Sequence, residues 1–168
     1  MPKTEEEITE LLKHRIEVND PTAMFQMGTT KYEEGDYKAA FEYLTKAAAL
    51  GDVDAHLHLS ILYQIGKGVE KDEKKERRHL TEAAIAGHPN AHYNLGYLEE
   101  KNGRVDRVLK HWTIAAKLGS DLALKGVKDL YKAGLMSKDD FAAALRGHHA
   151  AVDATKSHQR EEAAEIGF

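Results

Sequence analysis

The sequence predicts an all-α protein, a right-handed superhelix (an α-solenoid) of helix–turn–helix repeats with capping helices at both ends. Its 168 residues include 23 alanines, and alanine has the highest helix propensity because its side chain loses no entropy on folding. Only three prolines and 13 glycines are present, too few for a loop-rich chain. An alanine-centred phrase recurs, with Ala23, Ala55, Ala91 and Ala123 at intervals of 32, 36 and 32 residues. This period is typical of helical repeats.

Each repeat is expected to open a helix at the same place. The residues three positions before the anchoring alanines are Asp20, Asp52, His88 and Ser120. Aspartate and serine favour this position because their oxygen atoms accept a hydrogen bond from an otherwise unpaired helix N–H group. Pro21 and Pro89 then suit the first helical turn, where the missing N–H group would have no partner. We interpret His88 as a tolerated variant of the cap, not as a functional histidine.

Glycines and an apolar stripe define the second half of each repeat. Gly35, Gly66 and Gly103 are expected to end the first helices, because glycine adopts the left-handed conformation without a steric penalty. Apolar residues at helical spacing then predict the second helices. They are Phe41, Leu44, Ala47 and Ala48, then Leu80, Ala83 and Ala84, and finally Leu109, Trp112, Ala115 and Ala116. Glu76 replaces a small or apolar residue of the other repeats, so we expect looser packing there.

We predict one domain over residues 1–168. Its expected parts are an N-terminal capping helix (1–20), repeats at 21–51, 52–87 and 88–119, a partial fourth repeat (120–134), and a C-terminal capping helix with a tail (135–168). Thr4 with Glu7 forms a candidate capping box. Ser137 and Asp140 are expected to start the final helix, and its polar end, from Lys156 onward, is expected to be exposed or frayed.

Composition and charge exclude several classes of function. The formal net charge of −4 gives no electrostatic reason to expect nucleic-acid binding. No apolar run approaches the ~20 residues that cross a bilayer, so we expect no membrane insertion. The first residues lack the apolar core of a secretory signal, and a cytoplasmic location is our expectation. The absence of cysteine excludes disulfides, thiolate catalysis and cysteine-based zinc sites.

We expect no catalytic residues, no cofactor and no metal site. The segment Gly66-Lys67-Gly68 lacks the remaining residues of a phosphate-binding loop. His56 and His58 are two residues apart and His148 and His149 are adjacent, so the members of each pair diverge on a helix. A competing hypothesis is an enzyme of unrecognised type, which would need a closed pocket of converging titratable groups.

The middle repeat combines a glycine loop and small residues at fixed places, namely Ala55, Leu59, Tyr63, Gly66, Gly68, Val69, Asp72, Ala83, Ala84 and Gly87. In these positions it resembles the Sel1-like repeat family, and the first repeat resembles the related tetratricopeptide repeat. Ser60 and Glu76 depart from the family pattern, and the resemblance covers residues 21–134. It implies a non-enzymatic adaptor or scaffold that holds a protein or peptide in a groove lined by the first helix of each repeat.

Register places a set of candidate groove residues on one side of the first helices. They are Gln26, Thr29 and Glu33, then His58, Ile61 and Ile65, then Asn94, Tyr97 and Lys101, with Lys128 near the edge of the last part. Alternatively, Ile61 and Tyr97 pack between adjacent first helices. The sequence is also compatible with a structural module that self-associates, and with the repeat region of a larger quality-control protein that carries a cysteine-rich, RING-like zinc module.

Overall fold

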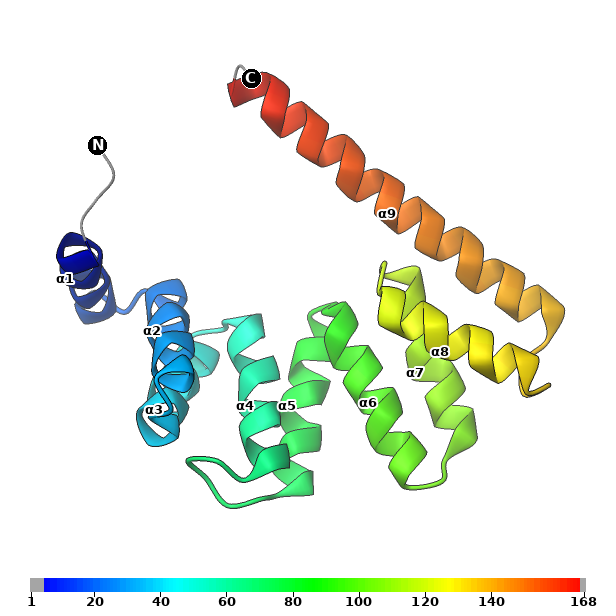
Figure 1. Ribbon diagram of the computed structural model, residues 1–168, viewed down its shortest axis with the longest axis horizontal. Coiled ribbons are helices and arrows are strands. Elements are labelled where there is room, and N and C mark those ends of the chain that lie inside the picture. The colour runs from blue at the N-terminus through cyan, green and yellow to red at the C-terminus, as the bar shows by residue number, and fades with distance from the viewer. Residues whose placement is uncertain (1–4, 167–168) are drawn as a thin grey trace. The chain divides into compact units, whose positions relative to one another are not determined.

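The computed structural model describes residues 5–166, which form nine α-helices and no β-strand (Figure 1). Their bounds are α1 Glu5–Glu17, α2 Pro21–Glu33, α3 Tyr37–Ala49, α4 Val53–Ile65, α5 Glu73–Ile85, α6 Pro89–Lys101, α7 Val105–Lys117, α8 Asp121–Lys132 and α9 Lys138–Ile166. The predicted all-α, helical-repeat fold is confirmed. Thr4, of the predicted capping box, lies outside the described residues. The chain divides into two compact units, Met1–Ala86 and Gly87–Phe168, which we describe separately.

The first unit contains two helical hairpins, α2–α3 and α4–α5, and α1 packs against α2. Helix α3 also packs against α4, so the two hairpins share a core. This core combines large and small side chains, among them Leu44, Ala47, Ala55, Leu59 and Leu62, all of them buried. The alanines of the repeat therefore lie where neighbouring helices approach each other.

The second unit contains the hairpin α6–α7, followed by α8 and the long helix α9. Helix α7 packs against α6, α8 and α9, and α8 also contacts α9. The core is built around Trp112, the only tryptophan of the chain, together with Val108, Ala115 and Val127. The indole Nε1–H of Trp112 donates a hydrogen bond to the backbone oxygen of Tyr93 over 3.1 Å.

Side-chain caps fix the start of the first helix in each repeat. The Asp20 carboxylate accepts hydrogen bonds from the N–H groups of Thr22 and Ala23 at 2.9 and 3.2 Å. Asp52 and Ser120 accept from the N–H group three residues on, at 2.8 and 3.2 Å. The imidazole Nδ1 of His88 accepts from the Asn90 N–H group at 3.2 Å. All four predicted caps are thus observed, including the histidine variant.

Two glycines of the second unit leave room for the large ring of Trp112. Gly96 lies on α6 and Gly126 on α8, and a Cβ atom built at either position would overlap the indole. The residue equivalent to Trp112 is Leu44 in the first hairpin and Leu80 in the second. The place of Gly96 is also glycine in the first hairpin, at Gly28, whereas His58 stands at the place of Gly126. The second unit therefore accommodates its larger core residue with a smaller neighbour on α8.

The last helix begins where the sequence predicts. The Ser137 hydroxyl oxygen accepts a hydrogen bond from the Asp140 N–H group at 3.1 Å and donates to the Asp140 carboxylate at 2.6 Å. Residues 153–162 of α9 are exposed, as expected for this polar segment, yet the helix continues to Ile166.

Glu76 is the one acidic residue that the sequence places on a packed face of the first unit. Its side chain is buried, and its carboxylate accepts a hydrogen bond from the Gln64 amide at 3.1 Å. This contact joins α5 to α4 and offsets part of the cost of burying a carboxylate.

Candidate functional site

The candidate groove residues of the first unit lie on α2 and α4, the first helices of its two hairpins. Gln26 and Glu33 are exposed, and Thr29, His58, Ile61 and Ile65 are half-buried. The ring of His58 meets that of Phe25 edge-on, with centroids 5.1 Å apart. This contact joins α2 to α4 on the first-helix side, although the register does not assign Phe25 to the groove.

The candidate groove residues of the second unit are mostly exposed. Asn94 is half-buried, whereas Lys101, Lys128 and Tyr97 are exposed, the last by 43% of its surface. The ammonium group of Lys101 lies 5.1 Å from the centre of the Tyr97 ring, within cation–π range. These side chains are accessible to a partner, and their joint role in one continuous groove stays a prediction.

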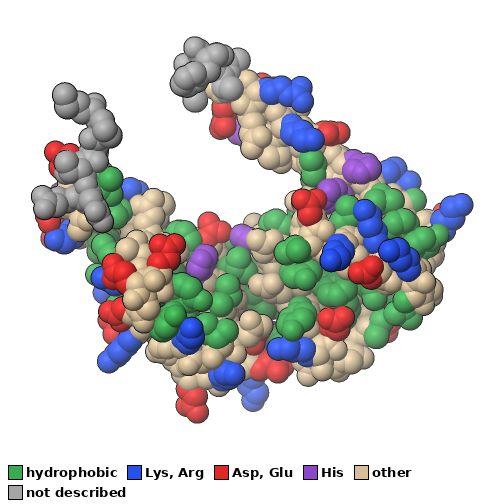
Figure 2. Space-filling view, in the orientation of Figure 1, with side chains coloured by type: hydrophobic (Ala, Val, Ile, Leu, Met, Phe, Trp, Pro, Cys, Tyr) green, Lys and Arg blue, Asp and Glu red, His purple; other side chains and the backbone are tan. Residues whose placement is uncertain are grey.

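A cleft of about 380 Å³ lies between α6 and α8 of the second unit. Its lining residues are Tyr93, Glu100, Trp112, Leu122, Lys125, Gly126, Asp129 and Leu130. We call it the α6–α8 cleft. Figure 2 shows hydrophobic side chains among charged ones on the viewed side of these helices. None of the four candidate residues of this unit lines the cleft.

The α6–α8 cleft combines an apolar, aromatic wall with charges of both signs. The Tyr93 ring stacks on Trp112 with centroids 5.9 Å apart and planes 17° from parallel. Leu122 is 59% exposed at its edge. Lys125 and Asp129 lie one turn apart on α8, so the cleft presents both a cation and a carboxylate. A partner segment with an apolar side chain between charged residues would fit this cleft.

Strict repeat register identifies only the α8 side of this cleft, because it assigns Gly126 and Asp129 to the candidate face. Tyr93 and Lys125 each come two residues after an anchoring alanine, Ala91 and Ala123, and this position is not among those that the register assigns to the groove. The signal present in the sequence is an aromatic residue on the polar side of α6 and a lysine at the matching place on α8. The register places Lys125 only at the edge of the candidate face.

Two further clefts lie on other surfaces. One, of about 450 Å³, lies between α7 and the start of α9 in the second unit, where Leu109, Ile114 and Met136 line it with Lys110 and Lys117. The other, of about 440 Å³, lies in the first unit, where α1 and α2 meet and Tyr43 contributes from α3. Neither is formed by two first helices of successive repeats.

Two histidine pairs each join the two helices of a single hairpin, one in α4–α5 and the other in α6–α7. His56 on α4 and His79 on α5 have their Nδ1 atoms 2.9 Å apart, and those of His92 on α6 and His111 on α7 are 3.3 Å apart. Burial, the neighbouring His56 and the Arg78 charge lower the pKa of His79 from 6.5 to about 4, although Glu82 acts in the opposite direction. The His79 ring is therefore neutral at neutral pH.

Acidification is expected to destabilise the first unit through His79. Above pH 6.5 the ring is neutral in both the folded and the unfolded chain, so its contribution to stability is fully present. Between pH 6.5 and about 4 only the unfolded chain takes up the proton, and stability is lost. Because the ring is half-exposed, solvent screening limits the loss to about 1–2 kcal/mol. Urea unfolding of wild type and His79→Gln across this range measures it. An equal pH dependence in both proteins would contradict the prediction.

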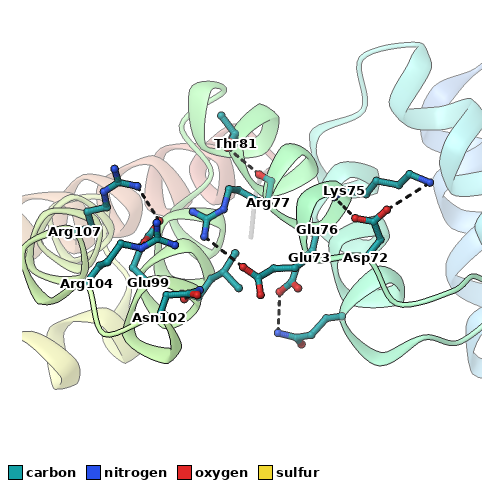
Figure 3. A network of polar contacts seen from close by, with 12 residues as sticks. Asp72, Glu73, Lys75, Glu76, Arg77, Thr81, Glu99, Asn102, Arg104 and Arg107 are labelled. Atoms are coloured by element: carbon teal, nitrogen blue, oxygen red, sulfur yellow. Dashed lines mark hydrogen bonds and ion pairs between the residues drawn. The ribbon is translucent and has the colours of Figure 1, made fainter.

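A buried carboxylate organises the turn between α6 and α7 (Figure 3). Glu99 is 1% exposed, and one of its oxygens lies 2.6 Å from Nε of Arg104. Arg107 is more distant, at 3.7 Å from the other oxygen. The Asn102 amide donates to the Leu98 backbone oxygen at 2.8 Å and closes the end of α6. These contacts hold the hairpin turn that precedes Trp112.

Figure 3 also shows the start of α5, in the first unit. The Asp72 carboxylate accepts a hydrogen bond from the Lys75 N–H group at 3.0 Å, which caps this helix. Arg77 lies 3.8 Å from Glu73 one turn earlier. The charged stretch that the sequence places after the glycine loop is therefore a capped helix start.

Membrane-spanning helices and clusters of metal ligands are both absent from the described part of the chain. Within residues 5–166, no helix has the length and the apolar character needed to span a membrane. In the same part of the chain, no three or more histidine, cysteine, aspartate or glutamate side chains come together in a way that could hold a metal ion.

Helical hairpins of 32 to 36 residues, each with a capped first helix and a small-residue contact, define a helical-repeat protein. The Sel1 repeat model matches residues 21–52, 53–88 and 89–120. These three matches cover more than half of the sequence, and the chain belongs to the Sel1 repeat family. Proteins of this family bind protein partners and are generally interaction scaffolds, typically without enzymatic activity.

Solved structures with similar folds include two bacterial proteins. A Sel1 repeat protein from Oxalobacter formigenes is 28% identical with a TM-score of 0.71, over 86% of this chain and 63% of that one. The protective antigen c5321 of uropathogenic Escherichia coli, which has an SLR fold, is also 28% identical, with a TM-score of 0.70, over 86% of this chain and 33% of that one. This chain thus spans less than two thirds of either relative. No curated protein matches it significantly.

Proposed function

We propose that the chain is a non-enzymatic adaptor that binds a protein segment at the α6–α8 cleft. The observation that carries the proposal is the exposed apolar edge of Leu122 beside the stacked rings of Tyr93 and Trp112. Binding hot spots are enriched in aromatic residues that lie in rigid, packed pockets. The hydrogen bond from Trp112 to the Tyr93 backbone fixes this wall before any partner arrives.

The charges around the cleft favour a bound segment of a particular pattern. Lys125 and Asp129 lie on α8, and Glu100 lies across from them on α6. A segment with one large apolar side chain and flanking charges of both signs would match this distribution. Because exposed charge pairs contribute little affinity, we assign most of the binding energy to the apolar side chain and the orientation to the charges.

The proposal is tested by pull-down of partners from an extract of the source cells, followed by affinity measurement with the purified partner. Leu122→Asp is expected to weaken binding at least tenfold, which corresponds to about 1.4 kcal/mol. Leu122 is exposed near the start of α8, so an aspartate there leaves the core untouched and is compatible with the helix N-terminus.

Two matched variants distinguish this cleft from other surfaces. Tyr97→Ala tests the candidate groove residue outside the cleft, and Ile114→Asp tests the cleft between α7 and α9. We expect partner recovery to fall most strongly for Leu122→Asp. Full recovery with Leu122→Asp, or a loss confined to one of the other two variants, would overturn the assignment. Thermal unfolding of each variant separates lost binding from lost folding.

A further inference from the structure

The two histidine pairs occupy the same place in consecutive hairpins. The first member follows the anchoring alanine on the first helix, and the second lies four residues before the alanine pair of the second helix. His56 and His79 are 23 residues apart in the chain, and His92 and His111 are 19 apart. Neither pair can therefore be recognised as a short sequence motif.

The distance within each pair suits chelation of a metal ion. Zinc binds histidine nitrogen at about 2.0–2.1 Å, so two nitrogens on one ion are about 2.9 Å apart at a right angle and about 3.3 Å apart at a tetrahedral angle. The Nδ1 atoms are 2.9 Å apart between His56 and His79 and 3.3 Å apart between His92 and His111. The folded hairpins thus hold two imidazole nitrogens at ligand spacing without further movement of the helices.

We propose that each pair is a two-histidine site for a divalent transition-metal ion of the zinc type, with water completing the coordination. Imidazole is a preferred ligand of such ions. In the metal-free pair, one Nδ1–H group donates to the Nδ1 lone pair of the other ring. In the metal-bound pair both rings carry their proton on Nε2, and both Nδ1 lone pairs bind the ion. Each ring stays neutral and keeps one proton, so the change requires a tautomer shift of one ring and a rotation of the rings that turns both Nδ1 lone pairs toward the ion.

Partial burial and a ring contact favour this use of the first pair. Both His56 and His79 are half-buried, so an ion can reach them from solvent while the hairpin restrains the rings. The stacked Tyr63 ring, with its centroid 5.7 Å from that of His79, further orients one ligand.

The first hairpin supplies an internal comparison. Met24 and Tyr43 stand at the positions equivalent to the two histidines, so this hairpin has no imidazole pair. The proposal therefore requires two zinc equivalents per chain, not three. The first hairpin also indicates conservative replacements, because His56→Met and His79→Tyr introduce the residues that it has at the equivalent positions.

Zinc titration of the chelator-treated full chain, followed by calorimetry near neutral pH, tests the proposal. Wild type is expected to bind two equivalents, His79→Gln and His111→Gln one each, and the double variant none. His58→Gln and His149→Gln, which leave both pairs intact, should still bind two. Zinc should also raise the melting temperature of wild type, and this rise should disappear in the double variant.

Three results would overturn the proposal. They are failure of wild type to bind zinc, unchanged uptake by the double variant, and loss of uptake in the His58 or His149 controls. Circular dichroism establishes that each variant is folded. If a glutamine variant unfolds, His79→Tyr and His56→Met replace it, and the same loss of one equivalent is expected.

Discussion

Replacing Trp112 with alanine is expected to lower the free energy of unfolding by about 3–5 kcal/mol, the range measured for deleting a large aromatic side chain from a packed core. Trp112 is only 7% exposed and contacts the helices on both sides of α7. Alanine would also remove the donor of the hydrogen bond to the Tyr93 backbone oxygen. Urea unfolding followed by circular dichroism measures the loss, because the variant has no tryptophan fluorescence.

A substitution at Gly96, which contacts Trp112, tests whether the fit of the indole ring against α6 contributes to stability. In wild type, Gly96→Ala is expected to cost about 1–3 kcal/mol, because the new methyl group would overlap the indole. In a Trp112→Ala background the large side chain is absent, and the same change should be neutral or stabilising, since alanine favours a helix over glycine by about 1 kcal/mol. Equal effects in both backgrounds would show that Gly96 is not required by the tryptophan.

Local chemistry explains why so much of the fold could be predicted from the sequence. Asp20, Asp52 and Ser120 specify helix starts through contacts within three residues, and these contacts are visible in the sequence itself. Repetition reinforces the signal, since the same pattern recurs at a nearly constant interval. The glycines that end the first helices follow the same logic, as Gly35, Gly66 and Gly103 all have positive φ angles.

The candidate site was less predictable because it depends on contacts between helices. Whether Tyr93 or Asn94 lines a cleft depends on a rotation of about 100° around the axis of α6, which the repeat register leaves open. The orientation is set by the Trp112 ring and its glycine neighbours, which come from three different helices. The histidine pairs escape sequence-based prediction for the same reason, because their members lie on separate helices.

Removing the Arg104 side chain is expected to lower the free energy of unfolding far more than its exposure suggests. Its side chain is 43% exposed, yet its guanidinium lies 2.6 Å from the carboxylate of the buried Glu99. Breaking a buried ion pair by deleting one partner costs about 3–5 kcal/mol when it leaves a buried charge poorly compensated. Because Arg107 stays 3.7 Å from this carboxylate, we expect Arg104→Ala to fall near the lower limit, at about 3 kcal/mol.

Removing the charge of Glu99 should cost much less stability than removing Arg104, and this asymmetry is the sharper test. Glu99→Gln removes the buried charge, and Arg104 and Arg107 can be hydrated where they stand, so we expect a cost of about 1 kcal/mol. The double variant Arg104→Ala with Glu99→Gln should then be more stable than Arg104→Ala alone, by about 1–2 kcal/mol. Arg104 makes no side-chain capping bond to α7, so its loss does not disturb the helix start. Unfolding free energies of the four proteins form a complete cycle, and additive costs would show that burial of the Glu99 charge is not what makes Arg104 necessary.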